Sequence, residues 1–80
     1  MKNLLLIQML SKSLYETSST DEYKIAYESF QKKDYVKAEE YYKKACDAGI
    51  FKACYNLGYM YEQGQGVEQN FDKAIEIYTK

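Results

Sequence analysis

The sequence predicts an all-α protein, an α-solenoid of two helix-turn-helix hairpins. Residues common in amphipathic helices, chiefly Ala, Glu, Lys and Tyr, dominate a chain that contains no proline. The second half of the chain also repeats the first, which is typical of solenoids. Because 80 residues are few for an independent core, we expect the stacked helices or a cross-link to support it.

The first two helices are predicted by their end signals. Residues 19–22 (STDE) have the spacing of a capping box, so a helix begins at Ser19 and runs to about Lys32. Asp34 caps a second helix, which ends before Gly49, a residue suited to a left-handed C-cap. The helical period places four residues of the second helix on one apolar face: Tyr35, Ala38, Tyr42 and Ala45.

Two further helices follow. The third is expected from about Phe51 to Gln63, where Gly64 stops it, with Ala53, Leu57 and Tyr61 at four-residue intervals. After a loop, Asn70 caps the fourth helix, which we expect to continue to Lys80. Its predicted buried face consists of Phe71, Ala74, Ile75 and Tyr78.

The chain contains an internal repeat. Residues 34–44 align with residues 70–80 at a constant offset of 36, which pairs Lys37 with Lys73 and Tyr42 with Tyr78. The preceding helices align at an offset of 32, which pairs Tyr23 with Tyr55 and Tyr27 with Tyr59. The second unit therefore has four additional residues in its inner loop. These alignments divide the chain into units 19–49 and 50–80.

The second unit carries the elements of a known family. Residues 53–61 (ACYNLGYMY), 64–67 (GQGV), 73–74 (KA) and 78–80 (YTK) resemble one Sel-1-like repeat, a relative of the tetratricopeptide repeat. The unit 19–49, whose loop is shorter, is more similar to a plain tetratricopeptide hairpin. Cysteines at the end of one unit and the start of the next further resemble the cysteine-rich secreted branch known from Helicobacter, whose members are named after β-lactamases. The resemblance implies the solenoid fold.

This resemblance implies a disulfide between Cys46 and Cys54, the only cysteines of the chain. The two residues flank a turn at Gly49, so an antiparallel hairpin can bring their side chains within bridging distance. Closing a loop of this size would stabilise the fold by about 2 to 3 kcal/mol. The alternative is two small buried thiols in a reducing cytosol.

The ends of the chain carry signals of location and completeness. Residues 1–18 combine Lys2 with an apolar run, which predicts either a secretory signal peptide or a short N-terminal helix. The first predicts a secreted or periplasmic protein, and the second leaves a cytoplasmic one open. By the repeat, Ala and Cys should follow Lys80, so we expect a truncated member or fragment. Its open apolar edge would favour self-association.

Composition excludes several function classes. The chain has no His, which excludes Ser-His-Asp and Cys-His catalysis, and two cysteines cannot complete a zinc site. All basic residues are Lys and the net charge is −1, so we expect no nucleic-acid partner. No apolar run is long enough to span a membrane, and we expect no cofactor or metal. The S-x-x-K sequence of residues 29–32 lacks the S-D-N and K-T-G elements of penicillin-recognising enzymes, so no catalytic residue is assigned.

The predicted function is that of a protein-interaction module. In tetratricopeptide-like units the first helix of each hairpin lines a concave surface, which implies two aromatic pairs there, with Lys52 and Asn56 as donors for a peptide carboxylate or backbone. The predicted binding residues are Tyr23, Tyr27, Lys52, Tyr55, Asn56 and Tyr59. Some of these tyrosines could instead pack in the core. The alternative function, implied by the cysteine-rich branch, is binding or hydrolysis of β-lactams.

Overall fold

The computed structural model describes residues 18–80, which form four α-helices and, within this range, no strand. The helices are α2 (Ser19–Gln31), α3 (Tyr35–Asp47), α4 (Phe51–Gln63) and α5 (Phe71–Tyr78). The all-α prediction is therefore confirmed. Residues 1–17, on which the choice between a signal peptide and an N-terminal helix depends, lie outside the described residues.

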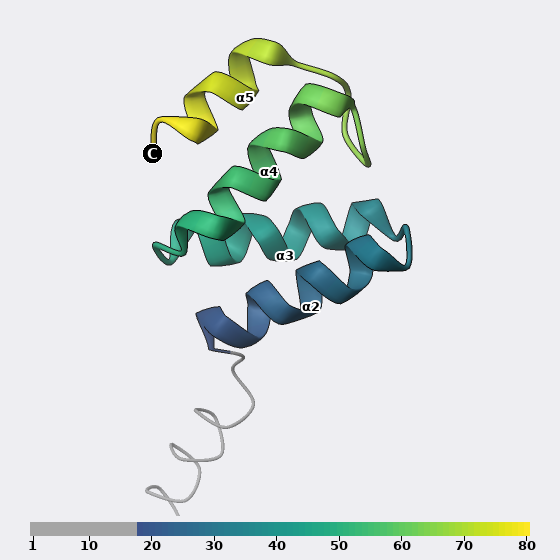
Figure 1. Cartoon of the computed structure of the whole chain (residues 1–80), viewed down its shortest axis with the longest axis vertical. Coiled ribbons are helices and arrows are strands. Elements are labelled where there is room, and N and C mark those ends of the chain that lie inside the picture. The colour runs from purple at the N-terminus through teal and green to yellow at the C-terminus, as the bar shows by residue number, and fades with distance from the viewer. Residues whose placement is uncertain (1–17) are drawn as a thin grey trace, which may run out of the picture.

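Each helix packs against the next one in the sequence. Figure 1 shows α2 and α3 as one hairpin and α4 and α5 as a second, with α4 lying beside α3. Alanines at the helix crossings allow this close packing, and larger side chains fill the space around them. The core contains Ala26, Ala38, Tyr42, Ala45, Ala53, Leu57, Met60 and Ile77. This arrangement is the predicted solenoid of two hairpins.

Side-chain caps begin three of the four helices. Asp34 and Asn70 cap α3 and α5 as predicted, accepting hydrogen bonds from the backbone N–H groups of Lys37 and Lys73. The cap of α2 is Ser18, which accepts from the backbone N–H of Asp21 at 3.2 Å, and not the predicted Ser19. The prediction was wrong by one residue because consecutive serines offer equivalent caps. Helix α4 begins after Ile50 without a side-chain cap.

Residues with positive φ end the helices and turn the chain. Gly49 has φ +96° between α3 and α4, in the left-handed region that the sequence predicts there. Its N–H donates to the carbonyl of Cys46, and Ile50 donates to that of Ala45. Lys33 occupies the corresponding turn between α2 and α3 with φ +64°, which is unfavourable for a side-chain-bearing residue. The connections from α2 to α3 and from α3 to α4 are therefore both short, tight turns.

The loop between α4 and α5 lies against the start of α3. Gly66 has φ +72°, and a Cβ atom there would lie 2.6 Å from the carbonyl carbon of Tyr35. The loop also returns to α4, because Gln69 donates from Nε2 to the carbonyl oxygen of Glu62 and Asn70 donates from its backbone to Tyr61. The glycine-rich stretch is therefore a structural loop of the second hairpin that packs against the first hairpin at Tyr35.

Helix α5 differs from its predicted burial. Ala74 and Ile77 are buried against the core, whereas Phe71 and Ile75 remain 59% and 60% exposed and Tyr78 is 38% exposed. The sequence contains two adjacent apolar stripes on this helix, and the stripe that includes Ala74 and Ile77 faces α4. The helix also ends at Tyr78, with Thr79 as its C-cap, and not at Lys80.

Candidate binding groove

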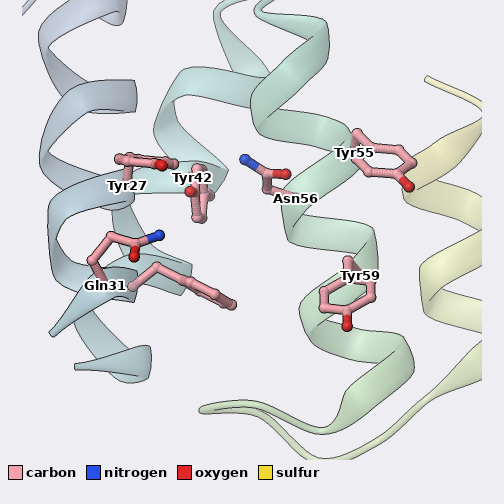
Figure 2. A pocket seen from close by; sticks show the side chains of 7 residues that line it. Tyr27, Gln31, Tyr42, Tyr55, Asn56 and Tyr59 are labelled. Carbon is pink, nitrogen blue, oxygen red and sulfur yellow. The ribbon is translucent and has the colours of Figure 1, made fainter. Parts of the chain in front are cut away.

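A groove opens between α2 and α4, across the surface of α3. It has a volume of about 260 Å³ and is open to solvent. Its lining residues come from three helices: Tyr27, Phe30 and Gln31 from α2, Tyr42 from α3, and Tyr55, Asn56 and Tyr59 from α4. Figure 2 shows Tyr27 and Gln31 on one side, Asn56 and Tyr59 on the other, and Tyr42 between them. The groove therefore exists only because the two hairpins stack.

Tyr42 forms the floor of this groove. Its side chain is only 2% exposed, and its ring meets the ring of Tyr23 edge to face at 5.7 Å between centroids. Burial raises the pKa of the Tyr42 hydroxyl to about 12, an effect that the hydrogen bond from Asn56 partly offsets. The floor is therefore a neutral phenol at every ordinary pH.

Asn56 connects the floor to the helix walls. Its side-chain nitrogen donates to the hydroxyl of Tyr23 at 3.5 Å and also lies beside the hydroxyl of Tyr42. These contacts join α4 to both helices of the first hairpin. Asn56 therefore helps to hold the two phenols of the first hairpin in place beneath the groove.

The walls are exposed aromatic rings. Tyr27 is 50% exposed on α2, and Tyr59 is 41% exposed on α4. Tyr55, further along the α4 wall, also contacts Tyr78 of α5, with 5.7 Å between ring centroids. Such rings offer apolar faces for packing while their hydroxyls stay in water. No charged side chain is among the seven residues that line the groove.

The structure brings four of the six predicted binding residues together in the groove: Tyr27, Tyr55, Asn56 and Tyr59. Tyr23 lies behind the floor, where its hydroxyl accepts from Asn56. Lys52 is an exposed residue of α4 that does not line the groove. Sequence reasoning missed Phe30, Gln31 and Tyr42 as lining residues, although the helical period had already placed Tyr42 on the inner face of its helix.

A disulfide joins the two hairpins next to the groove. Cys46 near the end of α3 is bonded to Cys54 in the first turns of α4, with 4.6 Å between their Cα atoms. The predicted pairing is confirmed. Both residues are buried, and each lies within one helical turn of a groove residue, Tyr42 or Asn56. The cross-link therefore fixes the start of the one helix that has no side-chain cap.

Two other features bear on chemistry and location. Ser29 and Lys32 line a shallow polar hollow, but Ser29 is only 6% exposed, so its hydroxyl is poorly accessible to a substrate. Over residues 18–80, no group of three or more His, Cys, Asp and Glu side chains is placed to hold a metal ion. In the same part of the chain no helix is long and apolar enough to cross a membrane.

Comparison with known proteins identifies relatives in bacteria and fungi. The chain is 42% identical over 72 residues to the candidate beta-lactamase HcpD of Helicobacter pylori. The aligned region covers 88% of this chain and 24% of HcpD. It is 38% identical over 50 residues to the beta-lactamase HcpA of the same species, covering 62% of this chain and 20% of HcpA. The ERAD-associated E3 ubiquitin-protein ligase component HRD3 of Candida glabrata is 43% identical over 51 residues, which are 64% of this chain and 6% of HRD3.

The chain thus spans about a quarter of the length of HcpD and less of the other two proteins. The family model of the Sel1 repeat matches residues 22–50 and again residues 51–80. These matches cover the two hairpins, including all the residues that line the groove and both cysteines. The chain belongs to the Sel1 repeat family.

Proposed function

We propose that this chain is a protein-interaction module that binds an extended peptide segment of a partner in the groove between α2 and α4. The observation that carries this proposal is the gathering of exposed tyrosines and amide side chains from α2 and α4 around one open groove, whose floor is Tyr42 of α3. Exposed aromatic rings supply contact area at low cost in side-chain entropy, and amides pair with a peptide backbone. Membership of the Sel1 repeat family supports a protein-binding role, as does the similarity to HRD3, a component of a larger ligase.

A peptide-display selection tests this proposal. A random library is selected on the wild-type protein, and the enriched peptides are then measured against a Tyr27→Ser/Tyr59→Ser variant and a Val36→Ser control. Tyr27 and Tyr59 are half-exposed, so their replacement should leave the fold intact, and Val36 is 70% exposed on α3 outside the groove. We expect at least tenfold weaker binding to the double variant and unchanged binding to the control. Peptides that bind all three proteins equally would refute the groove as the site.

A second candidate function is binding or hydrolysis of β-lactams, which the names of HcpD and HcpA suggest. The only Ser-x-x-Lys sequence places Ser29 and Lys32 beside the same hollow, but no hydrogen bond joins these two residues in the described structure. Purified protein is incubated with a chromogenic β-lactam. Turnover abolished by Ser29→Ala and unaffected by Tyr55→Ala would favour the enzyme, and no turnover would favour the interaction module.

We also propose that the exposed face of α5 packs against a further helical surface, either another copy of the chain or a neighbouring hairpin. Tyr78 occupies the repeat position of Tyr42, yet it is far more exposed because Tyr42 is covered by α4. Phe71 and Ile75 extend the same apolar surface. Sedimentation analysis of the wild type and an Ile75→Lys variant tests self-association, which the charged variant should abolish.

The disulfide supports a location outside the cytoplasm, in a secreted or periplasmic compartment, because cytosolic thiols are normally kept reduced. Intact mass of protein recovered from its native compartment, measured with and without reductant, tests this location. Free thiols at Cys46 and Cys54 in that material would favour the cytoplasmic alternative.

A further inference from the structure

The exposed face of α5 is equivalent to a covered face of α3. The repeat offset of 36 aligns its three apolar residues with three residues of α3: Phe71 with Tyr35, Ile75 with Glu39, and Tyr78 with Tyr42. All three residues of α3 contact the second hairpin. The loop between α4 and α5 lies against Tyr35, and side chains of α4 donate hydrogen bonds to Glu39 and Tyr42. The exposed face of α5 therefore occupies positions that form an interface in the first hairpin.

One of these positions has changed its chemistry in α5. Glu39 accepts a hydrogen bond from the hydroxyl of Tyr61 at 3.5 Å, whereas Ile75 in the same position can accept none and is 60% exposed. A polar group placed opposite Ile75 would lose water without gaining a hydrogen bond. The partner of α5 must therefore present an apolar surface at this point.

The apolar surface continues from α5 onto the start of α4. Phe51 and Tyr55 are 77% and 64% exposed, and they lie with Tyr78 around one apolar hollow. We call this surface the α5 patch; its residues are Phe51, Tyr55, Phe71, Ile75 and Tyr78. Burial of their exposed parts would remove about 600 Å² per copy, or about 1,200 Å² for a pair of copies, from water. That area reaches the lower end of the range for stable interfaces.

The opposite end of the described structure does not complement this patch. Figure 1 shows α2 at one end of the stack of helices and α5 at the other. The offset of 32 aligns α2 with α4, so the face of α2 that corresponds to the one by which α4 covers α3 contains Asp21, Lys24 and Glu28, all exposed. Packing this face on the α5 patch of another copy would bury three charges against apolar side chains. Head-to-tail stacking of copies is therefore unfavourable.

Patch-to-patch pairing of two copies avoids this penalty. Ile75 lies midway between Phe71 and Tyr78, so a twofold axis near Ile75 would place Phe71 of each copy against Tyr78 of the other. The acidic residue of the first turn, Asp72, aligns with Val36, which stays 70% exposed on α3. The charge of Asp72 therefore lies at the rim of such an interface and stays in water.

We infer that the partner of the α5 patch is a second copy of this chain, paired patch to patch about a twofold axis that passes near Ile75. This inference rests on the proposed packing role of the exposed face of α5 and names the occupant of that face. Each copy in the dimer has its own groove between α2 and α4, so the dimer presents two binding sites to a partner.

The test is sedimentation equilibrium of the intact protein over a hundredfold range of concentration. We expect a monomer and a dimer in the wild type, with no larger species. Ile75→Lys and Ile75→Glu should each weaken the dimer at least tenfold, because like charges then meet at the twofold axis. An equimolar mixture of the two variants should recover dimers, because opposite charges then meet there. Val36→Lys, an equally exposed control outside the patch, should behave as the wild type does.

Circular dichroism checks that both Ile75 variants stay folded, as the exposure of this residue predicts. Species larger than a dimer that Lys24→Glu abolishes would indicate head-to-tail stacking and overturn the inference, while the packing role of α5 would stand. Variants that dimerise no better mixed than alone would overturn the twofold axis. A wild type that is monomeric at every concentration would overturn the inference and leave a neighbouring hairpin as the partner of α5. Association that neither Ile75 variant weakens would refute both the inference and the packing role of α5.

Discussion

Reduction of the disulfide between Cys46 and Cys54 should destabilise the protein by an amount that follows from its position in the sequence. The bond joins residues eight apart, and closing a loop of that length in the unfolded chain lowers its entropy by an amount worth about 2.5 kcal/mol at 25 °C. A domain of this size has a urea dependence of about 1 kcal/mol per molar. The midpoint of unfolding should therefore fall by about 2.5 M urea on reduction.

Urea titration followed by far-ultraviolet circular dichroism, with and without reductant, measures this shift. The reduced wild type keeps both sulfur atoms, so the comparison isolates the cross-link from the packing of the buried side chains. A Cys46→Ala/Cys54→Ala variant serves as the control, because its midpoint should not respond to reductant. Oxidised and reduced wild-type midpoints within about 0.5 M of each other would refute the assigned role of the disulfide.

Gly66→Ala should lower the free energy of unfolding by about 2 to 3 kcal/mol, because the new Cβ would meet the backbone of Tyr35. Gly49→Ala should lower it by only about 1 kcal/mol, because its left-handed φ is strained but the space around it is open. Equal urea midpoints for the two variants would contradict this reasoning. Lys33→Gly should instead stabilise the fold by about 0.5 kcal/mol by relieving its positive φ, seen as a higher midpoint. Stability should fall as the pH rises from 10 to about 12, because the Tyr42 hydroxyl ionises near 10 in the unfolded chain and near 12 in the folded one. Burial also raises the pKa of Tyr61 and Tyr78, so absorbance titration at 295 nm should show several late-ionising phenols in the wild type and one fewer in Tyr42→Phe. An unchanged late phase in that variant would contradict the assignment to Tyr42.

Helix ends were the most predictable features because their causes are local. Asp34 and Asn70 cap the following helix with their own side chains, and Gly49 and Gly64 supply the positive φ that a tight helix end requires. The error at Ser18 shows the limit of this reasoning, since neighbouring residues of the same chemistry cannot be ranked without the path by which the chain enters α2.

Burial on α5 was less predictable because two apolar stripes satisfy the same helical period. One contains Ala74 and Ile77, the other Phe71, Ile75 and Tyr78, and only the position of α4 selects the first. The lining of the groove likewise depends on how the helices are placed relative to one another. Tyr27 and Tyr59 could be proposed from the repeat, but the contributions of Phe30, Gln31 and Tyr42 depend on how α2, α3 and α4 are placed around one opening.

The helical class and the two-hairpin repeat follow from the sequence alone, because they depend on local propensity and on periodicity along the chain. The disulfide between Cys46 and Cys54 was implied by the family resemblance, with two free thiols as the alternative, and the structure contains the bond. The tertiary structure decided which apolar stripe of α5 is buried, that Lys52 lies away from the groove and that Tyr42 is its floor. Those outcomes depend on the angle and offset at which one hairpin stacks on the other. That geometry is set by the packing of many side chains at once, so no single segment of the sequence encodes it.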